Sequence, residues 1–150
     1  MLKENNSTIA EIVSARVFND RREIVFQAWA NPHLLAQWWG PKGFTNTFHA
    51  FDFKTGGLWN FTMHGPDGVS YHNKNRFAAI TIPEKIIFEH LEPIHTFKAT
   101  ASFEEADDKT KLVFSMLFAS VDEFEKVKDF IAVTNEENFD RLETVLKTIK

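Results

Sequence analysis

The C-terminal stretch decides how the rest of the chain must fold: residues 120–150 read SVDEFEKVKDFIAVTNEENFDRLETVLKTIK. Ser120 followed by Glu123 matches a capping box, which marks a helix start. Apolar residues then recur with the 3.6-residue period of a helix that buries one face; they are Phe124, Val127, Ile131, Phe139, Leu142, Leu146 and Ile149. At about 1.5 Å per residue this helix, Ser120 to Lys150, would be about 45 Å long and would cross a whole small domain.

The apolar stripe of this helix is interrupted by Thr134, Asn135 and Asn138. One interpretation is a partly solvated stretch, because Asn is mostly exposed in proteins. The other is that this part of the helix roofs a cavity and places polar groups on its wall. The sequence leaves both interpretations open.

Composition limits the function classes. A chain of 150 residues with 43% hydrophobic content predicts a single domain over residues 1–150, with its core from about residue 9 onward. The net charge of −4 argues against a nucleic-acid partner. The lack of cysteine excludes disulfides and thiol catalysis. The polar start and the lack of a run of about 20 apolar residues predict a cytoplasmic protein with no membrane partner.

Upstream of the long helix, residue alternation predicts one strand, two short helices and six further strands. The expected strands are Ile9–Asn19, Phe44–Phe53, Leu58–His64, Val69–Ile82, Ile86–Leu91, Phe97–Glu104 and Lys111–Ala119, and the short helices are Arg22–Ala30 and Pro32–Trp38. In the first strand, Ile9, Val13, Ala15 and Val17 share one side.

The short turns between these strands require antiparallel neighbours. The resulting sheet has one apolar face, and only the C-terminal helix is long enough to cover it. The sequence therefore predicts an α+β fold: an antiparallel sheet of about seven strands curves around the long helix, with a space near the short helices.

Several separated motifs resemble one known pattern. They are Trp38-Trp39-Gly40-Pro41, Gly56-Gly57-Leu58-Trp59, residues 63–68 (MHGPDG), Pro83-Glu84-Lys85-Ile86 and residues 135–142 (NEENFDRL). The chain resembles the bacterial homologues of the activator of the heat-shock protein 90 ATPase, within the START-like (SRPBCC) superfamily. This resemblance covers nearly the whole chain. It implies a helix-grip fold, related to START and Bet v 1 proteins, with a deep cavity between the sheet and the long helix.

The resemblance also bears on function. Superfamily members bind lipids, hormones or other apolar molecules, and some are cyclases or hydrolases. It links the family to stress response through the co-chaperone role of eukaryotic relatives. Those relatives carry an additional N-terminal domain, for which we expect no room in this chain.

Strand parity and helix position give the expected cavity wall. Its residues are Trp38, Trp39, Trp59, Phe61, Met63, Tyr71, Asn73, Phe77, Phe88, His90, Phe97, Phe114, Ile131, Asn135, Asn138 and Phe139. An apolar wall with a few polar groups is typical of a small-molecule site, and the amides, Tyr71 and His90 would orient a ligand. The alternative is an ordinary core whose polar groups satisfy one another or buried water. The 16 Phe and 4 Trp of the chain fit both interpretations.

Other chemistry has weaker support in the sequence. The histidines are scattered and lack the spacing of local ligand pairs, so we expect no metal; they are His33, His49, His64, His72, His90 and His95. His64 and His72 lie across one hairpin, on the face expected to point outward. Acid–base catalysis would need His90 or Tyr71 beside a carboxylate, and no paired carboxylates are expected inward. Ser102 and Ser115 match no recognised catalytic motif.

Trp38 and Trp39 are adjacent at a helix end, so we expect that only one of them faces the core. The other would lie at the cavity mouth or in a contact between subunits, which makes a homodimer an expected partner. Our main hypothesis is binding of a small hydrophobic or amphipathic ligand, with no cofactor and no catalytic residue. A cyclase- or hydrolase-type enzyme using the same cavity, and a co-chaperone-like interaction module, are the alternatives.

Overall fold

The computed structural model describes residues 10–93 and 96–149. Its strands are β2 (Glu11–Phe18), β3 (Thr45–Phe51), β4 (Leu58–His64), β5 (Ser70–Thr81), β6 (Lys85–Glu92), β7 (Phe97–Ala106) and β8 (Lys109–Phe118). Its helices are α1 (Arg22–Ala30), α2 (Pro32–Trp38) and α3 (Val121–Thr148). All described strand pairs are antiparallel and form one seven-stranded sheet.

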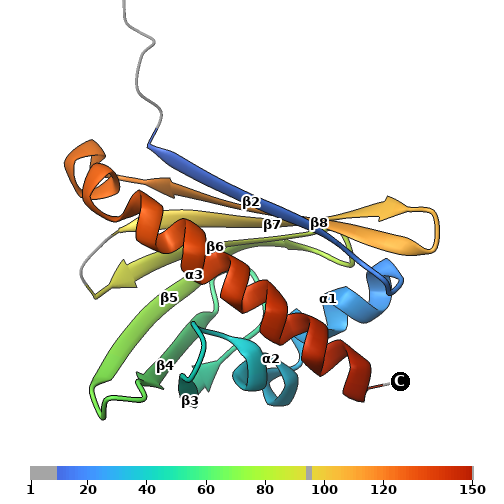
Figure 1. Ribbon diagram of the computed structural model, residues 1–150, viewed down its shortest axis with the longest axis horizontal. Coiled ribbons are helices and arrows are strands. Elements are labelled where there is room, and N and C mark those ends of the chain that lie inside the picture. The colour runs from blue at the N-terminus through green and yellow to red at the C-terminus, as the bar shows by residue number, and fades with distance from the viewer. Residues whose placement is uncertain (1–9, 94–95, 150) are drawn as a thin grey trace, which may run out of the picture.

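The sheet order is β2-β8-β7-β6-β5-β4-β3, so the first described strand lies beside the last one. The sheet curves around α3, and α1 and α2 lie beside the C-terminal half of α3 (Figure 1). These arrangements confirm the predicted α+β fold. They also follow from the chain order, because the two short helices separate β2 from the β3–β8 meander and let β2 pair with its far end.

The long helix begins where the sequence predicts it. The hydroxyl of Ser120 accepts a hydrogen bond from the backbone N–H of Glu123 at 3.2 Å. The α3 face toward the sheet buries Phe139, Leu142 and Leu146, and the ring of Phe139 meets the ring of Phe18 edge-on at 5.7 Å. The last residue of the expected helix, Lys150, lies outside the described residues.

The predicted inward faces are confirmed for most strands. Buried on the concave side are Trp59, Phe61, Ile86, Phe88, Ala99, Ala101, Phe103, Leu112, Phe114, Met116 and Phe118. The first strand differs, because its apolar side faces solvent: Val13 is 58% exposed and Val17 is 48% exposed. The opposite side, with Ile12, Ser14 and Phe18, is buried. Ile9 lies outside the described residues.

The reversed face of β2 has a physical reason. This edge strand lies against α3, whose facing side carries Asn135 and a row of carboxylates. Ser14 and Arg16 supply matching polar partners there, so the side of the strand that carries them, together with Ile12 and Phe18, turns inward. The valines project from the outer face of the sheet. Within the described residues, no helix is long and apolar enough to cross a membrane.

The two tryptophans at the end of α2 both pack inward, so the expectation that only one of them would is wrong. Trp38 is 1% exposed, and its indole N–H donates to the carbonyl of Ala28 at 3.0 Å. Trp39 is half-buried and packs against the core, with its ring 5.0 Å from that of Trp59. α2 ends at Trp38, and the extended backbone of Trp39 (φ −69°, ψ 133°) redirects its side chain away from the helical course.

Candidate functional site

The turn after α2 forms one edge of the site because α3 holds it in place. The amide N–H of Gly40 donates to the side-chain oxygen of Asn138 at 2.8 Å. The amide N–H of Lys42 donates to the carboxylate of Glu137 at 3.1 Å. The guanidinium of Arg141 donates to backbone carbonyls of the same turn. Three neighbouring residues of α3, Glu137, Asn138 and Arg141, therefore fix the turn that borders the cavity.

An inner chamber of about 220 Å³ lies between α3 and the sheet. Its wall comprises Trp39, Gly40, Pro41, Phe61, Met63, Asn73, Asn75, Phe88, His90, Phe97, Phe114, Met116, Ile131, Thr134, Asn135 and Asn138. Most of these side chains are aromatic or aliphatic, and the polar ones are amides, one hydroxyl and one imidazole. This is the make-up of a small-molecule site.

A larger outer groove of about 470 Å³ adjoins the inner chamber and shares part of its wall. The groove is lined by Pro41, Phe44, Met63, Tyr71, Asn73, His90, Pro93, Phe130, Val133, Thr134 and Glu137. Pro41, Met63, Asn73, His90 and Thr134 line both spaces, so they mark the junction between them. Phe130 is 70% exposed and Val133 is 59% exposed, which makes the rim of the groove apolar.

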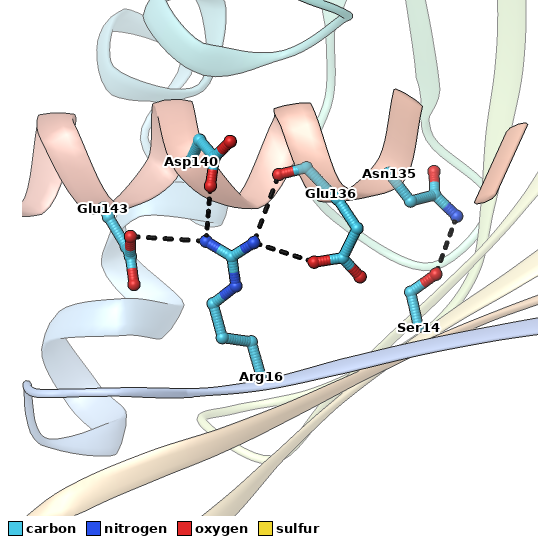
Figure 2. Close-up of polar contacts among 6 residues, drawn as sticks. All are labelled: Ser14, Arg16, Asn135, Glu136, Asp140 and Glu143. Carbon is cyan, nitrogen blue, oxygen red and sulfur yellow. Dashed lines mark hydrogen bonds and ion pairs between the residues drawn. The ribbon is translucent and has the colours of Figure 1, made fainter. Parts of the chain in front are cut away.

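The polar groups of the wall are held in place by hydrogen bonds to other groups of the protein. His90 Nδ1 lies 2.8 Å from Asn75 Oδ1, and the amide nitrogen of Asn75 donates to the carbonyl of Trp59 at 3.0 Å. The amide nitrogen of Asn135 donates to the hydroxyl of Ser14 at 3.2 Å, and its oxygen points away from Ser14 (Figure 2). These contacts fix the orientation of the side chains before any ligand enters.

Most of the residues that the sequence predicted for the cavity wall line one of the two spaces. Trp39, Phe61, Met63, Asn73, Phe88, His90, Phe97, Phe114, Ile131, Asn135 and Asn138 line the inner chamber, and Tyr71 lines the outer groove. Trp38, Trp59, Phe77 and Phe139 are 1–2% exposed and lie in the core, outside both walls. Strand parity places a side chain on the concave face, but it does not tell whether a neighbour such as Trp39 lies between that side chain and the cavity.

The sequence analysis did not include Asn75 and Met116 in the wall. Both could have been found from parity, because Asn75 shares a face with Asn73 on β5, and Met116 shares one with Phe114 on β8. Gly40 and Pro41 also line the chamber. The turn after α2 places them in the wall. The residue pattern alone does not predict where that turn lies.

The model of a protein family matches residues 20–147, and its description is activator of Hsp90 ATPase homolog 1-like protein. The chain belongs to this family. The resemblance of the motifs around Trp38 and Asn135 is therefore confirmed. No curated protein matches the sequence.

Solved structures show that the fold of this family member is shared widely. A protein from Arthrobacter aurescens is 23% identical, with a TM-score of 0.87 over 93% of this chain and 87% of that one. A protein from Mycobacterium smegmatis is 21% identical, with a TM-score of 0.84 over 95% and 94%. A protein from Nitrosomonas europaea is 16% identical, with a TM-score of 0.84 over 92% and 94%. At these identities the likeness concerns the fold alone.

Two of the described histidines that the sequence analysis considered as metal ligands bind threonine hydroxyls instead. His64 Nε2 lies 2.8 Å from the Thr47 hydroxyl, and His72 Nδ1 lies 2.8 Å from the Thr62 hydroxyl, both on the outer face of the sheet. Within residues 10–93 and 96–149, no group of three or more His, Cys, Asp or Glu residues is arranged to hold a metal ion. His95 lies outside the described residues.

The possible catalytic groups are also dispersed. The Ser115 hydroxyl donates to the carboxylate of Glu11 at 2.5 Å, across the pair of β2 and β8 and outside the cavity wall. Among the described residues that line the cavity, Glu137 is the one carboxylate, and it belongs to the outer groove. The geometry provides a pocket with fixed amides and an imidazole, which suits binding and orientation of a ligand.

Proposed function

We propose that this protein binds a small apolar or amphipathic molecule in the cavity between α3 and the sheet. The observation that supports this most is the inner chamber of about 220 Å³, which shares wall residues with an apolar outer groove of about 470 Å³. Burial of apolar ligand surface in such a space contributes about 25 cal/mol per Å². The mechanism is sequestration, with the amides and His90 setting the orientation of the ligand's polar group.

The wall supports binding over a plain core. A plain core would be filled to the usual packing density of protein interiors, so no space of this size would remain. Here Asn73, His90 and Thr134 line two adjoining spaces. The family's fold is typical of ligand binding. The exposed aromatic patch expected of an interaction module does not form at Trp38 and Trp39, because both side chains pack inward.

The test uses a fluorescent probe and a matched pair of variants. The uncharged fluorophore N-phenyl-1-naphthylamine is expected to bind the delipidated protein with increased emission. Ile131→Trp fills the inner chamber and should weaken probe binding about tenfold or more, because the wall cannot expand without strain. Leu117→Trp makes the same kind of change on the outer face, where Leu117 is 45% exposed, and should leave probe binding unchanged.

Native mass spectrometry of the protein as purified from cells provides an independent measurement. A co-purified molecule that is absent from Ile131→Trp and present in Leu117→Trp would support the proposal. The proposal fails if the wild-type chain neither increases the emission of the probe nor carries a co-purified molecule.

A further inference from the structure

His90 lies at the junction of the inner chamber and the outer groove, and it is 7% exposed. Its ring stacks on the ring of Phe97, with centroids 4.7 Å apart. Each ring nitrogen faces an oxygen atom. Nδ1 lies 2.8 Å from the side-chain oxygen of Asn75, and Nε2 lies 3.1 Å from the backbone carbonyl of Pro93.

Both of these oxygens accept hydrogen bonds and donate none. The Pro93 carbonyl is an acceptor by its chemistry. The orientation of the Asn75 amide is set by its other contact, because its nitrogen donates to the Trp59 carbonyl at 3.0 Å. A flipped amide would bring the Asn75 oxygen against the Trp59 oxygen, so the network itself assigns the atoms. Each nitrogen of His90 must therefore carry a hydrogen to make its contact.

A neutral imidazole carries one N–H and an imidazolium carries two. Only the imidazolium satisfies Asn75 and Pro93 together. A neutral ring would leave one nitrogen lone pair facing an oxygen that can only accept a hydrogen bond. Burial disfavours the charge, and the two hydrogen bonds to the charged ring offset that cost.

We propose that His90 is an imidazolium in the cavity wall, and that the cavity selects amphiphiles with a carboxylate over uncharged ones of the same chain length. This inference rests on the proposed function, since it names the class of ligand for the same cavity. A cation in a wall of mostly apolar side chains attracts an anion more strongly than it would in water. Because both ring nitrogens are engaged by the chain, His90 acts on the ligand through its charge.

Asn138 supplies a hydrogen-bond donor on the opposite wall. Its oxygen accepts from Gly40 N–H at 2.8 Å, so its amide nitrogen is the group left for a ligand oxygen. Within the described part of the chain, that nitrogen donates to no protein acceptor. The carboxylate of Glu137 lines the outer groove and accepts a hydrogen bond from Lys42 N–H. Its negative charge repels an anion in the groove and so favours the inner side of the junction for the ligand's carboxylate.

Other titratable groups among the described residues lie in the outer groove or on the strand of His90. Tyr71 lines the outer groove with it. On its own strand, Glu89 and Glu92 are exposed and belong to neither wall. His90 is thus the cation among the described residues that line the cavity.

The test compares dodecanoate with dodecan-1-ol as competitors of N-phenyl-1-naphthylamine at about neutral pH. The wild-type protein should prefer dodecanoate by about tenfold or more. His90→Gln removes the charge and should bring the two affinities to within about twofold of each other. Asn138→Asp keeps an acceptor for Gly40 N–H but places a carboxylate in the wall, so it should weaken dodecanoate binding and leave dodecan-1-ol binding nearly unchanged. This variant provides the test if His90→Gln does not fold.

The proton state is read directly from the wild-type protein by long-range ¹⁵N–¹H NMR of the histidine side chains. Both ring nitrogens of His90 should show the shifts of protonated nitrogen, and His90→Gln assigns the signals. A neutral tautomer, or equal affinity of the wild-type protein for acid and alcohol, overturns this inference and leaves the proposed function standing. If neither compound displaces the probe and the probe itself does not bind, both fail.

Discussion

The guanidinium of Arg141 holds together the turn that closes one edge of the cavity. It donates hydrogen bonds of 2.8–3.3 Å to the backbone carbonyls of Gln37, Trp39, Gly40, Pro41 and Phe44. The last carbonyls of a helix have no partner within it, and α2 ends just before this turn. A planar fork of N–H groups matches several such carbonyls at once. Burial lowers the pKa of Arg141, since its partners here are neutral.

Replacing Arg141 should therefore loosen the turn and weaken the whole protein. Arg141→Met should lower the free energy of unfolding by about 3 kcal/mol, because it leaves several partly buried carbonyls without a donor. Arg141→Lys should recover only part of this, since an ammonium cannot reach all the carbonyls. Urea unfolding measures both. Arg21→Met, at an exposed position, is the control and should leave stability unchanged. Equal stability of Arg141→Met and the wild type would contradict the role of this side chain.

At the scale of single residues, the sequence predicts side-chain direction better than side-chain surroundings. Alternation along β4 and β8 places Phe61 and Phe114 correctly on the concave face. It cannot tell that Trp59 lies behind Trp39, because that depends on how α2 ends. His90 was predicted in the wall, but its two acceptors come from β5 and from the segment after β6, which only the fold brings together.

The link between β2 and α3 is an ion-pair network centred on Arg16. Glu136, Asp140 and Glu143 follow one another along one side of α3, and their carboxylates lie 2.8, 2.8 and 3.3 Å from the Arg16 guanidinium (Figure 2). The guanidinium also lies over the ring of Phe139, 5.4 Å from its centroid. This network, together with the packing of Phe18 on Phe139, explains why the side of β2 that carries Arg16 faces the helix.

Arg16→Met should destabilise the protein by about 1–2 kcal/mol, because the carboxylates are half-exposed and water weakens each pair. Burial alone would lower the pKa of Arg16, but hydrogen bonds to Glu136 and Asp140 and the charge of Glu143 raise it. A base whose pKa is raised on folding stabilises below its unfolded pKa and loses that effect as pH rises through the folded value. The difference between variant and wild type should therefore stay constant between about pH 7 and pH 9.

Salt and a control variant separate this network from general packing. About 0.5 M NaCl should reduce the effect of Arg16→Met, since screening acts on exposed charges. Lys128→Met removes an exposed ion pair within α3 and should leave stability unchanged. A loss that is insensitive to salt would assign the role of Arg16 to its contact with Phe139 instead.

At the scale of elements, the prediction succeeds wherever a local signal is strong. The period of α3 and its cap at Ser120 form as expected. The prediction of which side of the edge strand β2 faces inward is wrong. Arg16 and Ser14 bind partners on α3 that lie more than 100 residues away in the sequence. Alternation of apolar residues carries no information about such partners.

Taken as a whole, the molecule is packed unevenly along α3. From Asn135 onward, the helix buries Phe139, Leu142, Val145 and Leu146 against the sheet, α1 and α2. Before Asn135 it buries only Phe124, and its exposed apolar residues form the rim of the groove. The part of the helix that covers the cavity is thus the part with least packing. Segments with few buried contacts open locally more often than the core does.

Hydrogen–deuterium exchange measures this difference. Amides of residues 125–134 should exchange faster than those of 139–146, because each opening there exposes less apolar surface. Saturating N-phenyl-1-naphthylamine should slow exchange in residues 125–134 by about tenfold or more and leave the C-terminal half nearly unchanged, since a ligand stabilises only the closed form that binds it. In Ile131→Trp the probe should give little protection. Uniform exchange along α3, or protection confined to its C-terminal half, would mean that ligand entry does not involve this part of the helix.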